Sequence, residues 1–444
     1  MDSRFYKKEY VKYNLYPQQT KVLSILSKIL ITNSRYKRIK KEFDRIISDI
    51  FSVDKQEIFY FSSASKALEN YLKALSTERN IRNIYIPSFS CIELADAIVK
   101  SNCNLKVYDI QENLKPSIKT LYEISQDSTA VLILPSLFGK DNYPDDEYLK
   151  VLSELSIPII LDEAQTFPNI SFKLHSVIKK CAILISFGKS KPISSIGGGA
   201  VINKALLSNS SKLHYKVNTN NYYKKIFVNC GLRIKNKIAK YFGIYSNKYK
   251  SLEDLVFDKK QVNPNNTMEI DKLEIIMAYF RTIKYKKLYL KRRILKDDNL
   301  NLFGEKTFLN YNYLPLIINN ANRYEFMKQL GKKGIQSTLY YYPIHLIPFY
   351  KEKWNLSRCP ISEKIFSKIV ILPFGIDYSN KNLKNIIKKI GEIKELNRLV
   401  IEELIEDIVI EKDNNVKIIF KCEDKYFEAL DFINRQKCDI IASS

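Results

Sequence analysis

From residue 81 to residue 202, short apolar runs rich in β-branched side chains alternate with stretches of helical periodicity. This alternation predicts an α/β fold with a mostly parallel, doubly wound sheet and helices on both faces. Ligands of such sheets bind at the carboxyl ends of the strands, so we expect functional residues directly after each run. The predicted strands are Ile81–Pro87, Leu105–Ile110, Ala130–Pro135, Ile157–Asp162, Cys181–Phe187 and Gly199–Ile202. The predicted helices between them are Ser65–Ala74, Cys91–Ser101, Ser117–Glu123 and Asp146–Leu155.

Further units surround this core. The predicted division is an N-terminal helical segment at 1–50, a large domain at 51–260 with a basic insertion near 204–260, a long connecting helix within 261–300, a smaller C-terminal α/β domain at 301–399 and an appendage of unassigned role at 400–444. In the smaller domain the expected order is strand, helix, strand-like run and helix, at Tyr313–Ile318, Arg323–Lys333, Ser337–Tyr342 and Ile361–Val370. Other expected elements are helices within Gln18–Ile50, Thr267–Leu295 and Tyr426–Asn434 and a strand at Val416–Lys421.

Composition narrows the range of partners. The 444 residues are 45% hydrophobic, enough for a sizeable core, and they carry a net charge of +24. This charge favours anionic partners, but the lysines are spread rather than gathered in a stripe, so we predict no nucleic-acid partner. The segment Ile226–Tyr245 alternates apolar and basic residues. Such a pattern fits either a helix on a membrane surface or a helix packed on the main domain.

Cysteine and histidine usage argues against a disulfide scaffold and against a metal site. The seven cysteines form no Cys-x-x-Cys pair, and the three histidines lie far apart in the sequence. This pattern is typical of proteins of the reducing cytosol. The first ten residues are polar and basic, and no apolar run approaches the length of a membrane span. We therefore expect a cytoplasmic protein with neither signal peptide nor transmembrane helix.

Four short motifs after predicted strands carry side chains suited to chemistry. They are Phe61–Leu68, Ile159–Gln165, Ile185–Lys191 and Ser194–Ala200. The first is a turn of small residues that opens a helix, where free N–H groups suit a phosphate. Asp162 ends an apolar strand, and Gln165 follows it within hydrogen-bonding reach. Lys191 leaves a buried strand near small residues, where an amine loses its proton more easily.

This combination matches what pyridoxal phosphate (PLP) requires. A lysine amine holds the aldehyde as an imine, a carboxylate keeps the ring nitrogen protonated, and backbone and hydroxyl donors bind the phosphate. The three glycines at 197–199 let the backbone pass close to a bulky ligand. The sequence therefore predicts a PLP site with Lys191 as the cofactor lysine and Lys189 as the alternative.

These residues resemble the motifs of the DegT/DnrJ/StrS sugar aminotransferases, which share PLP fold type I, and the likeness covers about residues 50 to 395. The turn Ser63–Leu68 is similar to the family's Ser-Gly-Thr-Ala-Ala-Leu, and Asp162–Gln165 is similar to its Asp-x-Ala-Gln. Ser186, Phe187 and Lys191 follow the family's order before its paired glycines. Further similar stretches are Pro87–Ser90, Asn265–Met268, Tyr342–His345 and Leu372-Pro373.

The resemblance implies a role for each matching residue. Lys191 would hold the cofactor as a Schiff base and shuttle the proton between substrate and cofactor. Asp162 would bind the ring nitrogen, and Gln165 would hydrogen-bond the ring oxygen. The phosphate would be held by Ala64, Ser65 and Ser186. Asn265 would reach the phosphate from a neighbouring subunit, which implies a homodimer.

The sequence also departs from the family pattern. Cys91 stands where the family stacks an aromatic ring on the cofactor. The family's Gly-Glu-Gly-Gly reads Ile196–Gly199, so its carboxylate is missing, and the arginine of the Asn-Tyr-Arg-Met segment is Thr267. His345 matches a family histidine, which leaves both a catalytic and a structural role open.

The resemblance implies transfer of an amino group from glutamate or glutamine to a keto group on a nucleotide-linked sugar, in polysaccharide or secondary-metabolite synthesis. The presence of Lys191 argues against the lysine-less dehydratases of the same family. Two alternatives remain open. One is a PLP-binding regulatory or sensor protein, suggested by the basic segment and the appendage. The other is a PLP enzyme of another reaction type, such as a lyase.

Overall fold

The protein's structure is a computed structural model. It describes residues 33–139, 146–188, 190–210, 213, 217–218, 269–294, 313–318, 323–373, 382, 385–386, 389–390, 393, 405–410 and 416–420. Its centre is one sheet in which seven strands follow the spatial order β1-β7-β6-β5-β4-β2-β3. The strands are β1 (Ile58–Phe61), β2 (Asn83–Pro87), β3 (Asn104–Tyr108), β4 (Ala130–Pro135), β5 (Ile159–Asp162), β6 (Cys181–Ser186) and β7 (Gly199–Lys204).

The strands of the sheet run parallel from β3 to β6. Only β7 is reversed, because it pairs antiparallel with both β6 and β1. The predicted mostly parallel α/β sheet is therefore confirmed. In the register of β5 and β6, Asp162 lies opposite Leu184. The carboxyl ends of these two neighbouring strands thus meet at the same edge of the sheet.

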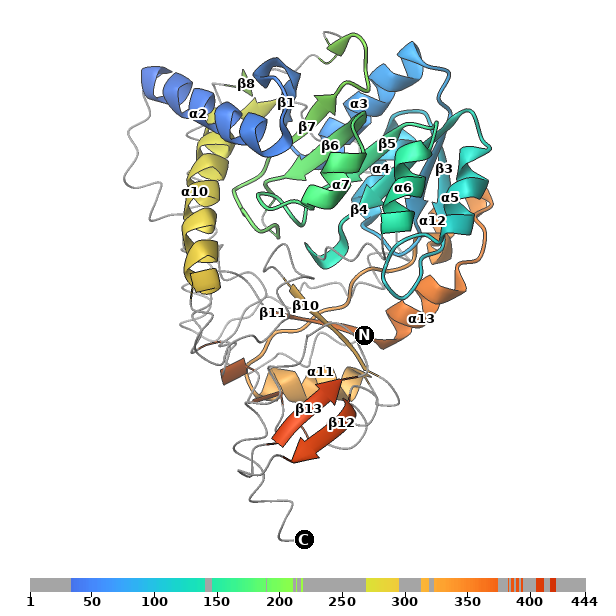
Figure 1. Ribbon diagram of the computed structural model, residues 1–444, viewed down its shortest axis with the longest axis vertical. Helices are drawn as coiled ribbons and strands as arrows, with labels where there is room; N and C mark the ends of the chain where they lie inside the picture. Colours follow the sequence, from blue (N-terminus) through green and yellow to red (C-terminus); the bar gives the residue numbers. More distant parts are fainter. Residues whose placement is uncertain are drawn as a thin grey trace.

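Helices cover both faces of the sheet (Figure 1). Successive side chains of a strand point to opposite faces, so each strand feeds two cores. In β4, Val131 and Ile133 pack in the core under α3 and α4, whereas Leu132 and Leu134 pack in the core shared with α2, α5, α6 and α7. These helices are α2 (Asn33–Phe51), α3 (Ala64–Glu78), α4 (Ile92–Lys100), α5 (Ile118–Ser125), α6 (Asp146–Glu154) and α7 (Phe172–Val177). Short 3-10 turns, η3 (Lys55–Glu57) and η4 (Leu137–Gly139), join neighbouring elements.

Serine caps decide where three of the helices begin. The side-chain oxygens of Ser63, Ser117 and Ser171 each accept a hydrogen bond from a backbone N–H in the first turn of α3, α5 and α7. Such a cap satisfies one of the donors that a helix start leaves without a partner.

A smaller lobe lies below the sheet in Figure 1. It contains the antiparallel pair β10 (Tyr313–Ile317) and β11 (Ile369–Pro373) together with α11 (Arg323–Lys332). Long helix α10 (Lys272–Ile294) connects the lobes and packs against α2. The remaining elements are β8 (Val217–Asn218), β9 (Ile270–Asp271), η7 (Ile344–Leu346), α12 (Pro348–Trp354), α13 (Pro360–Lys368), β12 (Ile405–Ile410) and β13 (Val416–Phe420).

The structure adds one strand that the sequence did not predict, and it differs from two expectations about local structure. Strand β1 carries no alternation, because all four of its residues are buried, and the sequence reading missed it. The run Ser337–Tyr342 is no strand: it forms a single bridge, between Thr338 and Ile371, and then turns toward the sheet edge. The helix expected to reach Val370 ends at Lys368, because the next residues pair with β10.

Several expectations concern residues outside those that the structure describes. They include the start of the N-terminal helical segment, the basic segment 226–245 and the helix at 426–434. Among the described residues, no helix is both long and apolar enough to cross a bilayer. The described cysteines are Cys91, Cys103, Cys181 and Cys359, and all four are free thiols. No cluster of metal-ligating side chains occurs in the described part of the chain.

Candidate active site

The edge where β5 and β6 end brings Asp162 and Lys191 together. Asp162 is the last residue of β5, and Lys191 lies in the loop that leads from β6 to β7. Two turns fix this loop: Lys191 N–H donates to the Gly188 carbonyl at 3.0 Å, and Ser194 N–H donates to the Lys191 carbonyl at 2.9 Å. The charge of Lys191 acts on the Asp162 carboxyl and on the Cys91 thiol. These three side chains therefore share one site.

Asp162 holds its proton unusually tightly for an aspartate. Burial raises the pKa of its carboxyl to about 6, against the lowering effects of the Lys191 charge and of the Ala164 N–H. The neighbouring charge of Glu163 raises this pKa further. Ala164 N–H donates to Asp162 Oδ1 at 3.0 Å. Carboxylates with perturbed pKa values cluster at functional sites.

Cys91 lies at the start of α4, beside Lys191 and Tyr341. Its thiol donates a hydrogen bond to the Glu93 carboxylate. Burial, helped by the Glu93 charge, raises the pKa of the thiol well above its usual value. At neutral pH the Cys91 thiol therefore keeps its proton and is a weak nucleophile. It can contact a ligand without reacting with it.

Gln165 is buried and held at both ends of its amide. Its Oε1 accepts a hydrogen bond from Phe138 N–H at 2.8 Å, and its Nε2 donates to the Tyr341 hydroxyl. The Tyr341 ring stacks on Phe138, with centroids 5.7 Å apart, and on Tyr340, with centroids 5.2 Å apart. The sequence reading missed Tyr341. The signal that was available is its position directly before the Tyr342–His345 stretch.

The turn that opens α3 packs against the glycines before β7. Gly198 N–H donates to the Ser62 carbonyl at 3.0 Å, and Gly198 has a φ of +93° that favours glycine. A Cβ at Gly199 would lie 2.4 Å from the Ala64 nitrogen, so only glycine lets the chains approach this closely. Ser65 lies in the first turn of α3.

Ser186 ends β6 next to this turn. It pairs with Gly199, and its hydroxyl accepts a hydrogen bond from Gly188 N–H at 3.3 Å. The start of α3, the end of β6 and the start of β7 thus converge, as the predicted phosphate contacts require. The N-terminus of a helix is a favourable place for a phosphate.

Two predicted residues lie outside the described part of the chain. Asn265, expected to reach the cofactor of a neighbouring subunit, is one of them, and so is Lys189, the alternative cofactor lysine. Their roles, and the homodimer that Asn265 implies, stay predictions.

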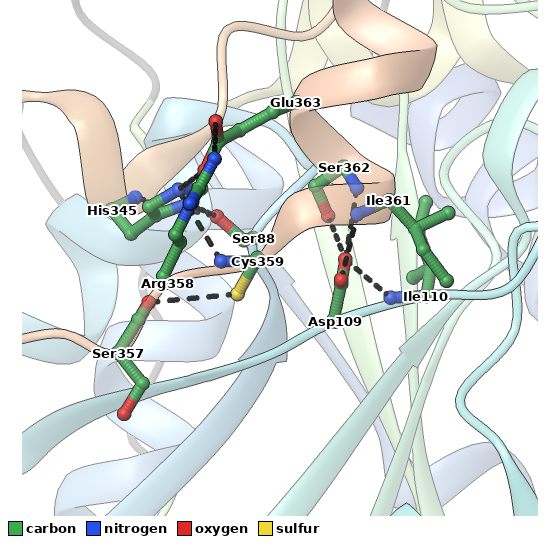
Figure 2. Close-up of polar contacts among 10 residues, drawn as sticks. All are labelled: Ser88, Asp109, Ile110, His345, Ser357, Arg358, Cys359, Ile361, Ser362 and Glu363. Carbon is green, nitrogen blue, oxygen red and sulfur yellow. Dashed lines mark hydrogen bonds and ion pairs between the residues drawn. The ribbon is translucent and has the colours of Figure 1, made fainter.

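His345 belongs to a second polar cluster, shown in Figure 2, which we call the His345 cluster and define as Ser88, Asp109, His345 and Glu363. His345 Nδ1 lies 2.5 Å from Ser88 Oγ, and Nε2 lies 3.1 Å from Glu363 Oε1. Nε2 also lies 3.4 Å from the backbone nitrogen of Cys359, so both ring nitrogens of His345 have polar partners within the protein. Asp109 accepts hydrogen bonds from Ile361 N–H at 2.8 Å and from Ser362 N–H at 2.9 Å.

The His345 cluster resembles a hydrolase triad in composition, but Ser88 is fully buried and bonds the opposite ring nitrogen. We interpret it as an anchor that ties η7 and α13 to the ends of β2 and β3. Because its side chains bond one another, the cluster favours the structural reading of His345.

The donors at the carboxyl edge of the sheet fit PLP. They comprise a lysine amine for the aldehyde, a carboxylate with a raised proton affinity for the ring nitrogen, and a capped helix start for the phosphate. The glycine at 199 lets the start of β7 approach the start of α3 closely, because a Cβ there would lie 2.4 Å from the Ala64 nitrogen.

Comparisons with known proteins agree. The fold and the site together define a PLP-dependent transaminase of fold type I. The chain belongs to the DegT/DnrJ/EryC1/StrS aminotransferase family, whose model matches residues 22–391. No curated protein matches the sequence.

Solved structures share the fold at low sequence identity. The aminotransferase PseC of Helicobacter pylori, involved in the biosynthesis of pseudoaminic acid, is 15% identical with a TM-score of 0.59, over 88% of this chain and 99% of that one. The ntda structure from Bacillus subtilis, with bound cofactor PMP, is 16% identical with a TM-score of 0.58, over 88% and 87%. The E. coli GDP-4-keto-6-deoxy-D-mannose-3-dehydratase is 14% identical with a TM-score of 0.58, over 86% and 100%.

Proposed function

We propose that this enzyme transfers an amino group from glutamate or glutamine to the keto group of a nucleotide-linked sugar, in the synthesis of a cell-surface polysaccharide or a secondary metabolite. The observation that carries the proposal is that Lys191, in the loop after β6, acts with its charge on Asp162 at the end of the neighbouring strand β5. Two of the structural neighbours act on sugars, the aminotransferase PseC and the GDP-4-keto-6-deoxy-D-mannose-3-dehydratase, and the net charge of +24 suits an anionic nucleotide sugar.

When bound, PLP supplies an aldehyde that takes up the amino group and a ring that withdraws electrons. In this proposal the Lys191 amine anchors the cofactor and then moves the proton between the amino acid's Cα and C4′ of the cofactor. Asp162 keeps the ring nitrogen protonated. Its raised pKa supports this role, because a carboxyl that holds a proton near neutral pH shares it readily with a base of similar strength.

The other predicted contacts keep their proposed roles. Gln165 would contact the ring oxygen, and its amide is already oriented by Phe138 and Tyr341. Ala64, Ser65 and Ser186 hold the phosphate, with Asn265 added from a second subunit. Cys91 offers its protonated thiol to the ring face. Family membership favours neither the sensor nor the lyase alternative.

The test is a two-stage assay of the purified holoenzyme. Glutamate or glutamine should bleach the absorbance of the lysine-bound cofactor, and a nucleotide-linked keto-sugar should restore it. Mass spectrometry should then detect an amino-sugar. The apoenzyme, without added PLP, is the control. A cofactor that ignores every amino acid, or a reaction that releases a product without an amine, would contradict the proposal.

A further inference from the structure

Behind Asp162 lies a buried carboxylate that the mechanism above does not use. Side chains alternate along a strand and its continuation, so Asp162 and Glu163 point to opposite sides of the sheet. Glu163 is fully buried on the side of α7. Its Oε1 lies 3.0 Å from His175 Nε2, and its Oε2 accepts a hydrogen bond from the Thr166 hydroxyl. A buried carboxylate in such a place needs an explanation, because its desolvation is costly.

The hydrogen bonds keep Glu163 charged. Burial acts to raise the pKa of its carboxyl, but the hydrogen bond and charge of His175, the Thr166 hydroxyl and the charge of Lys115 outweigh it, so the pKa lies below the usual value. The Nε2 proton of His175 must point at Glu163, because a carboxylate can only accept. No partner for His175 Nδ1 occurs among the residues that the structure describes.

The surroundings of Glu163 are fixed by several elements. His175 in α7 packs against the Phe51 ring of α2, with centroids 5.5 Å apart, and its carbonyl accepts a hydrogen bond from Lys204 of β7 at 3.1 Å. Lys115 is fully buried in the loop after β3 and lies 3.4 Å from the Pro135 carbonyl. Burial, together with the Glu163 charge, also raises the pKa of the Cys181 thiol in β6. Glu163 is therefore a buried charge that His175 and Thr166 hold by hydrogen bonds and that the charge of Lys115 favours.

We propose that Glu163, buried directly behind Asp162 and held by His175, is a positioning residue whose fixed charge acts through Asp162 on the cofactor's ring nitrogen. The inference rests on the proposed role of Asp162. A negative charge one residue away opposes ionisation of the Asp162 carboxyl. The same charge would stabilise a proton on the hydrogen-bonded pair of Asp162 and the ring nitrogen, so the ring would stay protonated to a higher pH. The Glu163–His175 pair thus sets the pH range in which the ring withdraws electrons.

The test compares pH titrations of the bound cofactor's absorbance, and of the ¹⁵N signal of labelled PLP, in the wild type and variants. Glu163→Gln keeps the shape of the side chain and can still accept from His175 and Thr166. It should lower the titration midpoint by roughly one pH unit, the size expected for a charge several ångströms away in a partly polar interior. Glu163→Asp, which keeps the charge, should stay near the wild type.

Two further variants separate charge from structure. His175→Phe removes the donor without touching the strand, so Glu163 takes up a proton more readily and the midpoint should fall in the same direction. This variant also serves if Glu163→Gln does not fold. Phe51→Leu loosens the packing on His175 while leaving the charges in place. It should lower the melting temperature and leave the midpoint unchanged.

The outcomes are distinct. An unchanged midpoint in both Glu163→Gln and His175→Phe, or an equal shift in Phe51→Leu, would overturn the role of Glu163 alone. A wild-type protein whose added PLP cannot be fixed to Lys191 by borohydride would overturn the proposed function, and this inference with it.

Discussion

Two polar clusters lie at carboxyl ends of strands in the same sheet, and they differ in how their side chains are used. In the His345 cluster, Ser88, His345 and Glu363 bond one another, and Asp109 bonds the start of α13. In the site at β5 and β6, burial and the charge of Glu163 oppose ionisation of the Asp162 carboxyl, whereas the charge of Lys191 favours it.

The comparison teaches that residue types alone do not identify an active site. The His345 cluster contains a serine, a histidine and a carboxylate in hydrogen-bonding order, yet its serine is fully buried and its bonds are internal. The Asp162 site contains a buried carboxyl whose pKa is about 6. We conclude that the first cluster stabilises the fold, and we propose that the second binds the cofactor at a cost in stability.

Replacing Lys191 should have the largest effect. Lys191→Ala removes the amine that anchors the cofactor and moves the proton, so kcat should fall by at least about 1,000-fold. Circular dichroism should show an intact fold. Lys189→Ala is the matched control and should retain activity within about threefold. Equal losses in both variants would remove the distinction between the two lysines.

Replacing His345 should affect stability rather than chemistry. His345→Ala removes the side-chain hydrogen bonds to Ser88 and Glu363 and opens a buried cavity, so the free energy of unfolding should fall by about 2–4 kcal/mol. Denaturant titration measures this loss. The kcat at a temperature where the variant is folded should fall less than about tenfold. A loss as large as that of Lys191→Ala would assign His345 to the chemistry.

Replacing Asp162 should stabilise the cofactor-free protein. Its folded pKa of about 6 lies above that of an unfolded aspartate, about 3.9. The folded state therefore binds more protons between pH 4 and 6, and the free energy of unfolding falls as pH rises through that window. Above it, Asp162→Asn should be more stable than the wild type by about 1–3 kcal/mol, whereas below about pH 4 the difference should vanish.

Asp109→Ala is the contrasting variant for this stability profile. Asp109 caps α13, so its loss should destabilise the protein by about 1–2 kcal/mol at neutral pH. Thermal unfolding from pH 4 to pH 8 compares both variants with the wild type. A destabilising Asp162→Asn would show that the two aspartates play the same structural role.

The smallest effect concerns the glycine that replaces a family carboxylate. A Cβ at Gly197 would lie 2.5 Å from Glu274 Oε1, and Glu274 Oε2 is fixed by a hydrogen bond from Asp271 N–H at 2.9 Å. Gly197→Ala should therefore cost about 1–2 kcal/mol. Adding Glu274→Ala should make the glycine change nearly neutral in a double-mutant cycle. Strict additivity would contradict this contact.

Much of the sheet follows from local patterns. Strand β4 has the predicted bounds, Ala130–Pro135, because a fully buried parallel strand is a continuous apolar run. Asp162 and Lys191 were also predictable, since strand ends of a parallel sheet meet at one edge. The partners of these residues were not predictable. Tyr341 reaches Gln165 across 176 positions, and neither apolar periodicity nor turn chemistry encodes such a contact.

The same limit applies to charge. Glu163 follows Asp162 directly, and its presence is plain in the sequence, but its ionisation depends on His175 in a separate helix. The alternation of the strand shows that the two carboxyls point apart, whereas only packing shows what each one meets. The structural role of His345 likewise depends on its hydrogen bond with Ser88, which lies 257 positions away in the sequence.

The most direct test of the account is the identity of the cofactor lysine. The holoenzyme reduced with borohydride and digested should yield one peptide carrying the added mass of reduced pyridoxal phosphate, with the modification at Lys191. Modification at Lys189, at another lysine or at none would contradict the account.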